Sequence, residues 1–128
     1  GMAWRFLPDD FRMASTYGVP DGSSLADWPI TDADLAEHWD WVEWEVGVCG
    51  DAAGHRALGP RRRGYPMPPL PPNAEARVLT RGASALDLST GSVPMLLNSV
   101  PHAGRARCVR RPVCRGTANP DACRRTSC

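Results

Sequence analysis

Residues 32–46 constrain this chain more than any other stretch, because the sequence predicts a complete helix there with both of its end signals. Thr31 can cap the first turn through its hydroxyl, and Asp34 stands three positions on, as the acidic partner of a capping box requires. Further acidic residues in the first turns suit the positive end of the helix dipole. Gly47 directly follows the helical residues and provides a left-handed stop.

The surface of this helix is very apolar for so short a chain. One stripe at helical spacing contains Leu35, Trp39, Val42 and Val46, and three more tryptophans lie off it, at positions 28, 41 and 44. Ordering fifteen residues costs on the order of 15–30 kcal/mol in chain entropy. Burying five large apolar side chains returns roughly 8–15 kcal/mol. The helix therefore needs a larger core, and we expect the chain to be a piece of a larger protein in which the tryptophans are packing residues.

Composition differs between the two halves of the chain. All nine aromatic residues lie between positions 4 and 65. Residues 1–58 hold eleven acidic residues and three arginines, whereas residues 59–128 hold three acidic residues and twelve arginines. The chain contains no lysine, which we interpret as the coding bias of a GC-rich genome rather than as adaptation to a partner.

Long parts of the chain carry turn signals instead of a periodic pattern. Residues 1–26 carry Gly, Pro and Asp turn signals, and residues 47–72 are rich in Gly, Arg and Pro, so both ranges predict irregular chain. Residues 60–72 (PRRRGYPMPPLPP) are a polyproline II candidate. They contain an arginine-led PxxP spacing at Arg63, Pro66 and Pro69. This spacing fits a ligand for an aromatic groove, but a rigid segment lying over a parent domain is the favoured interpretation.

Two further elements are expected downstream. Asn73 can cap a second, weaker helix from Ala74 to Arg81 or a little beyond, with Gly82 near its end. Residues 93–100 (VPMLLNSV) are short and contain a proline, which favours a strand or a buried extended segment. The expected fold class is α+β, as a fragment with one long amphipathic helix, one short helix and much irregular Pro/Gly-rich chain.

The cysteines and arginines near the end of the chain invite two other interpretations. Cys108, Cys114, Cys123 and Cys128 are separated by five, eight and four residues, whereas structural zinc sites pair ligands two to four residues apart. Neither a metal site nor a disulfide framework is favoured. Seven of the 24 residues from Arg105 onward are arginine, but nothing aromatic lies between them to stack on bases. We therefore expect no nucleic-acid partner.

Known signals for catalysis and targeting are absent from the sequence. His38, His55 and His102 share no ligand or triad spacing, and no glycine-rich nucleotide loop, zinc-protease or nucleophile-elbow motif occurs. The longest apolar runs are only a few residues, so no transmembrane segment is expected. No secretory signal pattern is visible, and the Gly-Met start fits either a cloning remnant or internal sequence, so the compartment cannot be predicted.

Five runs in register resemble one family. They are residues 1–11 (GMAWRFLPDDF), 26–30 (ADWPI), 43–50 (EWEVGVCG), 65–71 (YPMPPLP) and 97–99 (LNS). In this order and spacing the chain resembles the glucose–methanol–choline (GMC) oxidoreductases, in particular the bacterial sugar and polyol dehydrogenases that use FAD. The resemblance covers about residues 1–108.

The resemblance implies an FAD-binding Rossmann-type domain plus a substrate domain in the parent protein, which oxidises a CH–OH group of a sugar, polyol or other alcohol. The family's glycine-rich turn would lie upstream of Gly1, and its catalytic histidine and partner far downstream, so no catalytic residue is assigned here. Gly1, Met2 and Ala3 would follow a segment that runs along the flavin ring. These three are the only positions expected near the cofactor, and lining the adjoining core is an equal alternative.

The chain departs from the family pattern after Cys108. There the relatives show closely spaced cysteines, which some of them use for an iron–sulfur cluster, whereas here the arginine-rich run loses that spacing. We expect residues 1–108 to be an internal segment of a GMC-type flavoprotein and residues 109–128 to be a disordered or frameshifted tail. Such a fragment would hold FAD poorly and be inactive alone. The alternative is a non-enzymatic binding module that uses the proline-rich segment and the arginine-rich tail, and a small zinc protein is a weaker third option.

Overall fold

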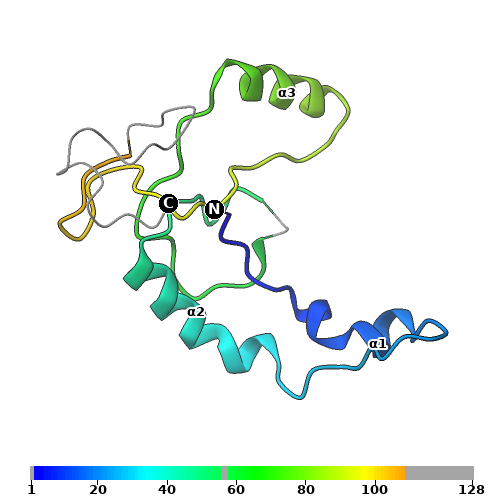
Figure 1. The fold of residues 1–128 in the computed structure, drawn as a ribbon. Coiled ribbons are helices and arrows are strands. Elements are labelled where there is room, and N and C mark those ends of the chain that lie inside the picture. The colour runs from blue at the N-terminus through cyan, green and yellow to red at the C-terminus, as the bar shows by residue number, and fades with distance from the viewer. Residues whose placement is uncertain (1, 56–57, 109–128) are drawn as a thin grey trace.

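The computed structural model describes residues 2–55 and 58–108, and helices alternate with long irregular segments in it (Figure 1). The helical elements are the 3₁₀ helix η1 (Pro8–Arg12), α1 (Met13–Tyr17), α2 (Asp32–Val46) and α3 (Ala74–Ala85). In the described ranges, β pairing is limited to isolated bridges between single residues. The α+β assignment therefore has no support in this part of the chain, which builds helices but no strand.

Helix α2 begins and ends at the predicted residues. The Asp34 amide donates to the Thr31 hydroxyl at 3.3 Å, and the Thr31 amide donates to the Asp34 carboxylate at 2.8 Å, which completes the predicted capping box. Gly47 adopts the left-handed conformation with φ of 87°, and its amide donates to the Glu43 carbonyl at 3.1 Å.

The buried face of α2 differs from the predicted apolar stripe. Its two buried residues are Asp40 and Glu43, whereas Val42 on the stripe and Trp41 beside it are exposed. The helix turns these carboxylates inward because two arginines from other segments lie against them. An apolar pattern alone could not predict this orientation, since it depends on partners that are distant in sequence.

The segment before α2 is more helical than predicted. Residues 8–17 form η1 and α1, although the turn signals there indicated irregular chain. The Asp10 carboxylate accepts from the Leu7 amide at 2.7 Å at the start of η1, and the Asp27 carboxylate accepts from the Ser15 amide at 3.0 Å in α1. Each helix is too short to show a periodic pattern. In addition, α1 is stabilised by Asp27, a residue that lies outside the helix.

An aromatic cluster joins this segment to α2. Phe6 makes edge-to-face contacts with Phe11, Trp28 and Trp39 at ring-centroid distances of 5.7–6.1 Å. Phe11 is the most buried member at 2% exposed, whereas Phe6 and Trp28 are each nearly half exposed. The cluster is therefore covered on one side only.

The innermost part of the structure is a junction of four segments, which we call the bridge core. Cys49 pairs with Met67 on one side and with Met95 on the other, and Met2 also pairs with Met95. The Cys49 amide donates to the Met95 carbonyl at 3.0 Å and the Met95 amide returns a bond to Cys49 at 2.9 Å. The predicted extended segment 93–100 thus lies in the core, but it pairs through one residue and does not form a strand.

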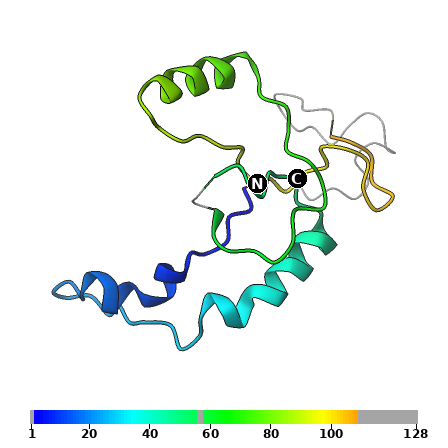
Figure 2. The ribbon, with the colours of Figure 1, turned by 180° about the vertical axis from the view of Figure 1, so that it is seen from behind.

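Helix α3 stands away from the rest on an arch that leaves and returns to the bridge core (Figures 1 and 2). The Ala76 amide donates to the Asn73 side chain at 2.8 Å, so the predicted cap is confirmed. The helix continues through Gly82 and ends at Ala85, a little beyond Arg81 as predicted, and none of its residues is buried. A glycine weakens a helix interior by only about 1 kcal/mol relative to alanine, so it does not have to end one.

Residues 102–105 form a tight hairpin that the sequence did not predict. The amide of His102 and that of Arg105 each donate to the other residue's carbonyl, at 3.0 and 2.9 Å. Ala103 and Gly104 between them have φ of 47° and 73°, as a two-residue turn of type I′ requires. Alanine is uncommon at a turn position with positive φ, so the residue types at 103–104 do not predict this turn.

Candidate functional site

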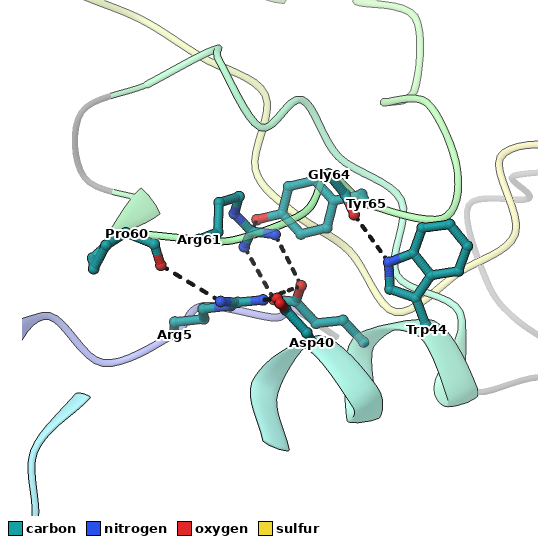
Figure 3. A network of polar contacts seen from close by, with 8 residues as sticks. Arg5, Asp40, Trp44, Pro60, Arg61, Gly64 and Tyr65 are labelled. Atoms are coloured by element: carbon teal, nitrogen blue, oxygen red, sulfur yellow. Dashed lines mark hydrogen bonds and ion pairs between the residues drawn. The ribbon is translucent and has the colours of Figure 1, made fainter. Parts of the chain in front are cut away.

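Two arginines from separate loops enclose one carboxylate of α2 (Figure 3). Arg5 and Arg61 each donate two hydrogen bonds to Glu43, at distances between 2.7 and 3.0 Å. Arg5 also donates to Asp40 at 2.6 Å. Asp40 and Glu43 are three positions apart and therefore lie on the same face of the helix. We call these four residues the ion-pair clamp.

The ion-pair clamp is buried and electrically balanced. The side chains of Arg5, Glu43 and Arg61 are 3%, 6% and 7% exposed, and that of Asp40 is 10% exposed. Burial raises the pKa of Glu43, but the hydrogen bonds from Arg5 and Arg61 outweigh burial and hold its pKa below the ordinary range. Two positive and two negative charges in mutual contact leave no side chain suited to act as an acid or base. The clamp is therefore a structural element rather than a catalytic one.

The proline-rich connection is fixed along α2 by aromatic contacts next to the clamp. The Arg61 guanidinium lies 3.9 Å from the centroid of the Tyr65 ring, and that of Arg63 lies 3.5 Å from the Trp44 ring. The Trp44 indole also donates to the Gly64 carbonyl at 3.0 Å (Figure 3). Arg63, the arginine of the predicted PxxP spacing, thus contacts a tryptophan of the same chain.

A cavity of about 240 Å³ lies beside the clamp, between Arg5–Phe6, the first turns of α2 and Pro60–Arg62. Pockets for cofactors and drug-sized ligands usually span about 300–1,000 Å³. This cavity is below that range, and the charged atoms of Arg5 and Arg61 on its wall already serve Glu43. It is too small to hold a dinucleotide.

The positions predicted to lie near a flavin are at the edge of the bridge core. Gly1 lies outside the described residues, whereas Met2 is 66% exposed and pairs with Met95. The Ala3 amide donates to the Pro94 carbonyl at 2.9 Å and so has no proton left for a ligand. Of the two described positions, Met2 presents an exposed apolar side chain, whereas the Ala3 amide is already used within the chain.

The starts of helices α2 and α3 do not suit the phosphates of a dinucleotide. The first turns of α2 and α3 carry Asp32, Asp34 and Glu75, and negative charge at a helix start repels a pyrophosphate. Side chains at Thr31 and Asn73 already occupy amides there. Neither helix start therefore forms a phosphate site of the dinucleotide-fold type.

The histidines and cysteines do not gather into a site in the described part of the chain. No cluster of three or more His, Cys, Asp or Glu residues suited to a metal is found there. His38 is exposed on α2, as expected, and His55 and His102 belong to separate segments. Cys114, Cys123 and Cys128, together with the whole predicted tail 109–128, lie outside the described residues. No helix of the described ranges has the length and apolarity to cross a membrane.

Comparison with known proteins supplies the context for this geometry. No family model matches the chain. The chain is 33% identical over 114 residues to paromamine 6'-oxidase of Streptomyces fradiae, across 89% of this chain and 19% of that protein. It is 35% identical over 115 residues to 6'''-hydroxyparomomycin C oxidase of Streptomyces lividus, across 89% and 20%. It is 34% identical over 107 residues to the fructose dehydrogenase large subunit of Gluconobacter japonicus, across 83% and 19%.

The chain is homologous to GMC-type oxidoreductases. It spans about a fifth of the length of the curated relatives it matches. The runs that carried the GMC resemblance are the ones that meet in the structure. Arg5 and Glu43 come from two of these runs and join in the ion-pair clamp, whereas Met67 and Asn98 come from two others and lie in the bridge core.

Sequence reasoning did not find the ion-pair clamp. One signal was present, because Arg5 stands between Trp4 and Phe6 in an otherwise apolar run. A charge in such a run is buried only when it is paired. The second signal was the pair of acidic residues, at positions 40 and 43, on the tryptophan-rich surface of the helix.

Proposed function

We propose that this chain is a segment of an FAD-dependent GMC oxidoreductase that oxidises the CH–OH group of a sugar, polyol or other alcohol. The observation that carries the proposal is the homology to three proteins, two oxidases and one dehydrogenase, that act on sugar-like alcohols. In the whole enzyme FAD would accept a hydride from the carbinol carbon. The parent would combine a Rossmann-type FAD domain with a substrate domain, and the α+β class is proposed for that parent.

Residues Gly1, Met2 and Ala3 are proposed to lie beside the flavin ring in that parent. The exposed side chain of Met2 and its backbone pairing to Met95 support this placement, since they present an apolar edge held by the bridge core. Binding of the pyrophosphate is assigned to chain outside residues 1–128, because the helix starts described above are acidic. The chain alone is therefore proposed to hold FAD weakly and to be inactive.

The remainder of the parent polypeptide is proposed to cover the open side of the aromatic cluster. Trp4, Phe6 and Trp28 are 43%, 46% and 48% exposed, and Trp41 on α2 is 64% exposed. So many exposed large rings are unusual for a monomeric soluble protein and indicate an interaction surface. The relatives are about five times as long as the matched segment, which supports a covering surface from the same polypeptide.

A chimera tests the proposed function. In the fructose dehydrogenase large subunit, the segment that matches this chain would be replaced by residues 2–108. We expect the purified chimera to retain bound flavin, measured by its absorbance, and to reduce a dye with fructose. A chimera carrying Glu43→Ala is the matched control and should lose flavin. Failure of the unsubstituted chimera to bind flavin, despite soluble expression, would contradict the proposal.

Titration of the 128-residue chain with FAD tests the second part of the proposal. We expect no saturable quenching of flavin fluorescence at micromolar concentrations. Tight binding, or reduction of a dye with a sugar donor by the chain alone, would show that the pyrophosphate site lies within this segment after all.

A further inference from the structure

Helix α3 has an apolar stripe on one face, and the stripe is open. It consists of Val78, Leu79 and Gly82 on the helix and Leu86 directly after it, which share an arc of about 100° at helical spacing. The residues Val78, Leu79 and Leu86 are 58%, 72% and 73% exposed. A Cβ added at Gly82 would meet nothing within 4 Å, so the middle of the stripe is uncovered as well.

The interactions of α3 are local, so the helix lacks the packing that usually stabilises one. Its opposite face carries polar side chains, those of Arg77, Thr80 and Ser84. Within the described part of the chain, no hydrogen bond, ion pair or ring contact joins α3 to a residue outside positions 72–88. A helix of 12 residues is marginal in water by itself, and most helices in proteins are stabilised by burying an apolar face. The stripe is therefore a face that needs a cover.

The area of the stripe indicates which kind of partner it suits. Full burial of one aliphatic side chain removes roughly 60–120 Å² of apolar surface from water. The exposed parts of Val78, Leu79 and Leu86 together therefore offer roughly 120–240 Å². A stable complex between separate proteins buries about 800 Å² on each partner and also costs translational and rotational freedom. The stripe is too small to hold a separate protein or a second copy, whereas a surface of the same polypeptide is already linked to it.

We propose that α3 is a docking helix whose apolar stripe fills an apolar groove in the rest of the parent polypeptide. This inference rests on the proposed function, because it requires a parent that is longer than the chain. The relatives are about five times as long as the matched segment and so have ample surface outside it. The contact is separate from the proposed cover over the aromatic cluster, since α3 stands apart from η1 and α1 in both views of the fold (Figures 1 and 2).

Hydrogen exchange of the α3 amides, followed by mass spectrometry, tests the proposal. It is measured in the 128-residue chain and in the chimera with the fructose dehydrogenase large subunit. We expect exchange to be at least about tenfold slower in the chimera, because the docked helix opens less often than the uncovered one.

Two pairs of substitutions separate docking from the stability of the helix itself. Leu79→Gln with Leu86→Gln removes the stripe, and Arg77→Gln with Ser84→Gln changes the opposite face at the same sequence spacing. Glutamine has nearly the helix propensity of leucine and arginine, so neither pair should change exchange in the 128-residue chain by more than about threefold. In the chimera, the first pair should remove the added protection of α3 and the second pair should leave it in place.

Equal exchange of α3 in the chimera and the chain, with or without bound flavin, would overturn the proposal, and so would equal effects of the two pairs. A 128-residue chain that sediments as a dimer, and as a monomer only with Leu79→Gln and Leu86→Gln, would also overturn it, because a second copy would then cover the stripe. Bound flavin separates this proposal from the proposed function. A chimera that protects α3 without holding flavin contradicts the function alone, whereas one that holds flavin with α3 unprotected contradicts the docking alone.

Discussion

Replacing Glu43 with alanine should open the bridge core, because this carboxylate is shared by both arginines of the ion-pair clamp. Four hydrogen bonds of 2.7–3.0 Å disappear, and the Arg61 guanidinium, with its side chain 7% exposed, loses its ion-pair partner. Removing one partner from a buried ion pair typically costs about 3–5 kcal/mol. Tenfold in an equilibrium constant corresponds to about 1.4 kcal/mol, so local opening should become roughly 10²–10⁴-fold more frequent.

Hydrogen exchange measured by NMR detects this opening without requiring a single cooperative transition. The informative amides are those of Cys49, Gly50 and Met95, which donate to Met95, Met67 and Cys49 respectively. Their protection should fall by the factor given above in Glu43→Ala. Glu45→Ala, an exposed site on the same helix, should change it by less than about threefold, since surface substitutions usually stay within about 0.5 kcal/mol. If both variants leave these amides equally protected, the clamp does not hold the core.

Three further predictions follow from the same structure. Burial raises the pKa of Glu43, but the hydrogen bonds from the two arginines outweigh burial and lower this pKa below its ordinary value of about 4.3. The stability that Glu43 contributes is therefore present above that pH and lost as the pH falls below it. The advantage of the natural chain over Glu43→Gln, followed by circular dichroism, should shrink on acidification, and an advantage that grows would refute the assignment. Gly47→Ala should destabilise α2 by about 1–3 kcal/mol in urea titrations, because φ is 87° there and the added Cβ would lie 2.6 Å from Arg105 Nη2. The control is Gly82→Ala, which has open space around it and should be neutral or stabilising. Ala103→Asn should stabilise the 102–105 hairpin by a few tenths of a kcal/mol, because asparagine tolerates the left-handed φ of 47° better than alanine, and unchanged or faster exchange at the Arg105 amide would contradict this.

Local signals account for the parts of the fold that the sequence predicted correctly. Thr31, Asp34 and Gly47 act within a few residues of the helix ends that they define, so both ends of α2 were predictable. The start of α3 at Asn73 was predictable for the same reason. Its end was predictable only to within a few residues, because a single glycine changes helix stability too little to decide where the helix stops.

Interactions between distant residues account for what the sequence did not predict. Arg5 bonds to Glu43 across 38 positions, and Arg61 bonds to it across 18. Neither arginine belongs to a periodic pattern that would indicate a partner. The bridge core is built from isolated bridges between single residues. A bridge of this kind does not need the alternation of apolar and polar residues by which a strand is predicted. The family resemblance identified the runs that meet, but not the contacts by which they meet.

The pairing of Cys49 with both Met67 and Met95 also makes the arch that carries α3 replaceable. The arch leaves the core at one of these residues and re-enters at the other, so its two ends are fixed by a common neighbour whatever lies between them. Halving or doubling such a connection changes its closure free energy by only about 0.6 kcal/mol. Residues 71–90, which are almost all exposed, are accordingly the natural place to exchange a helix for a reporter peptide, or to vary length between relatives, while the junction beneath keeps its geometry.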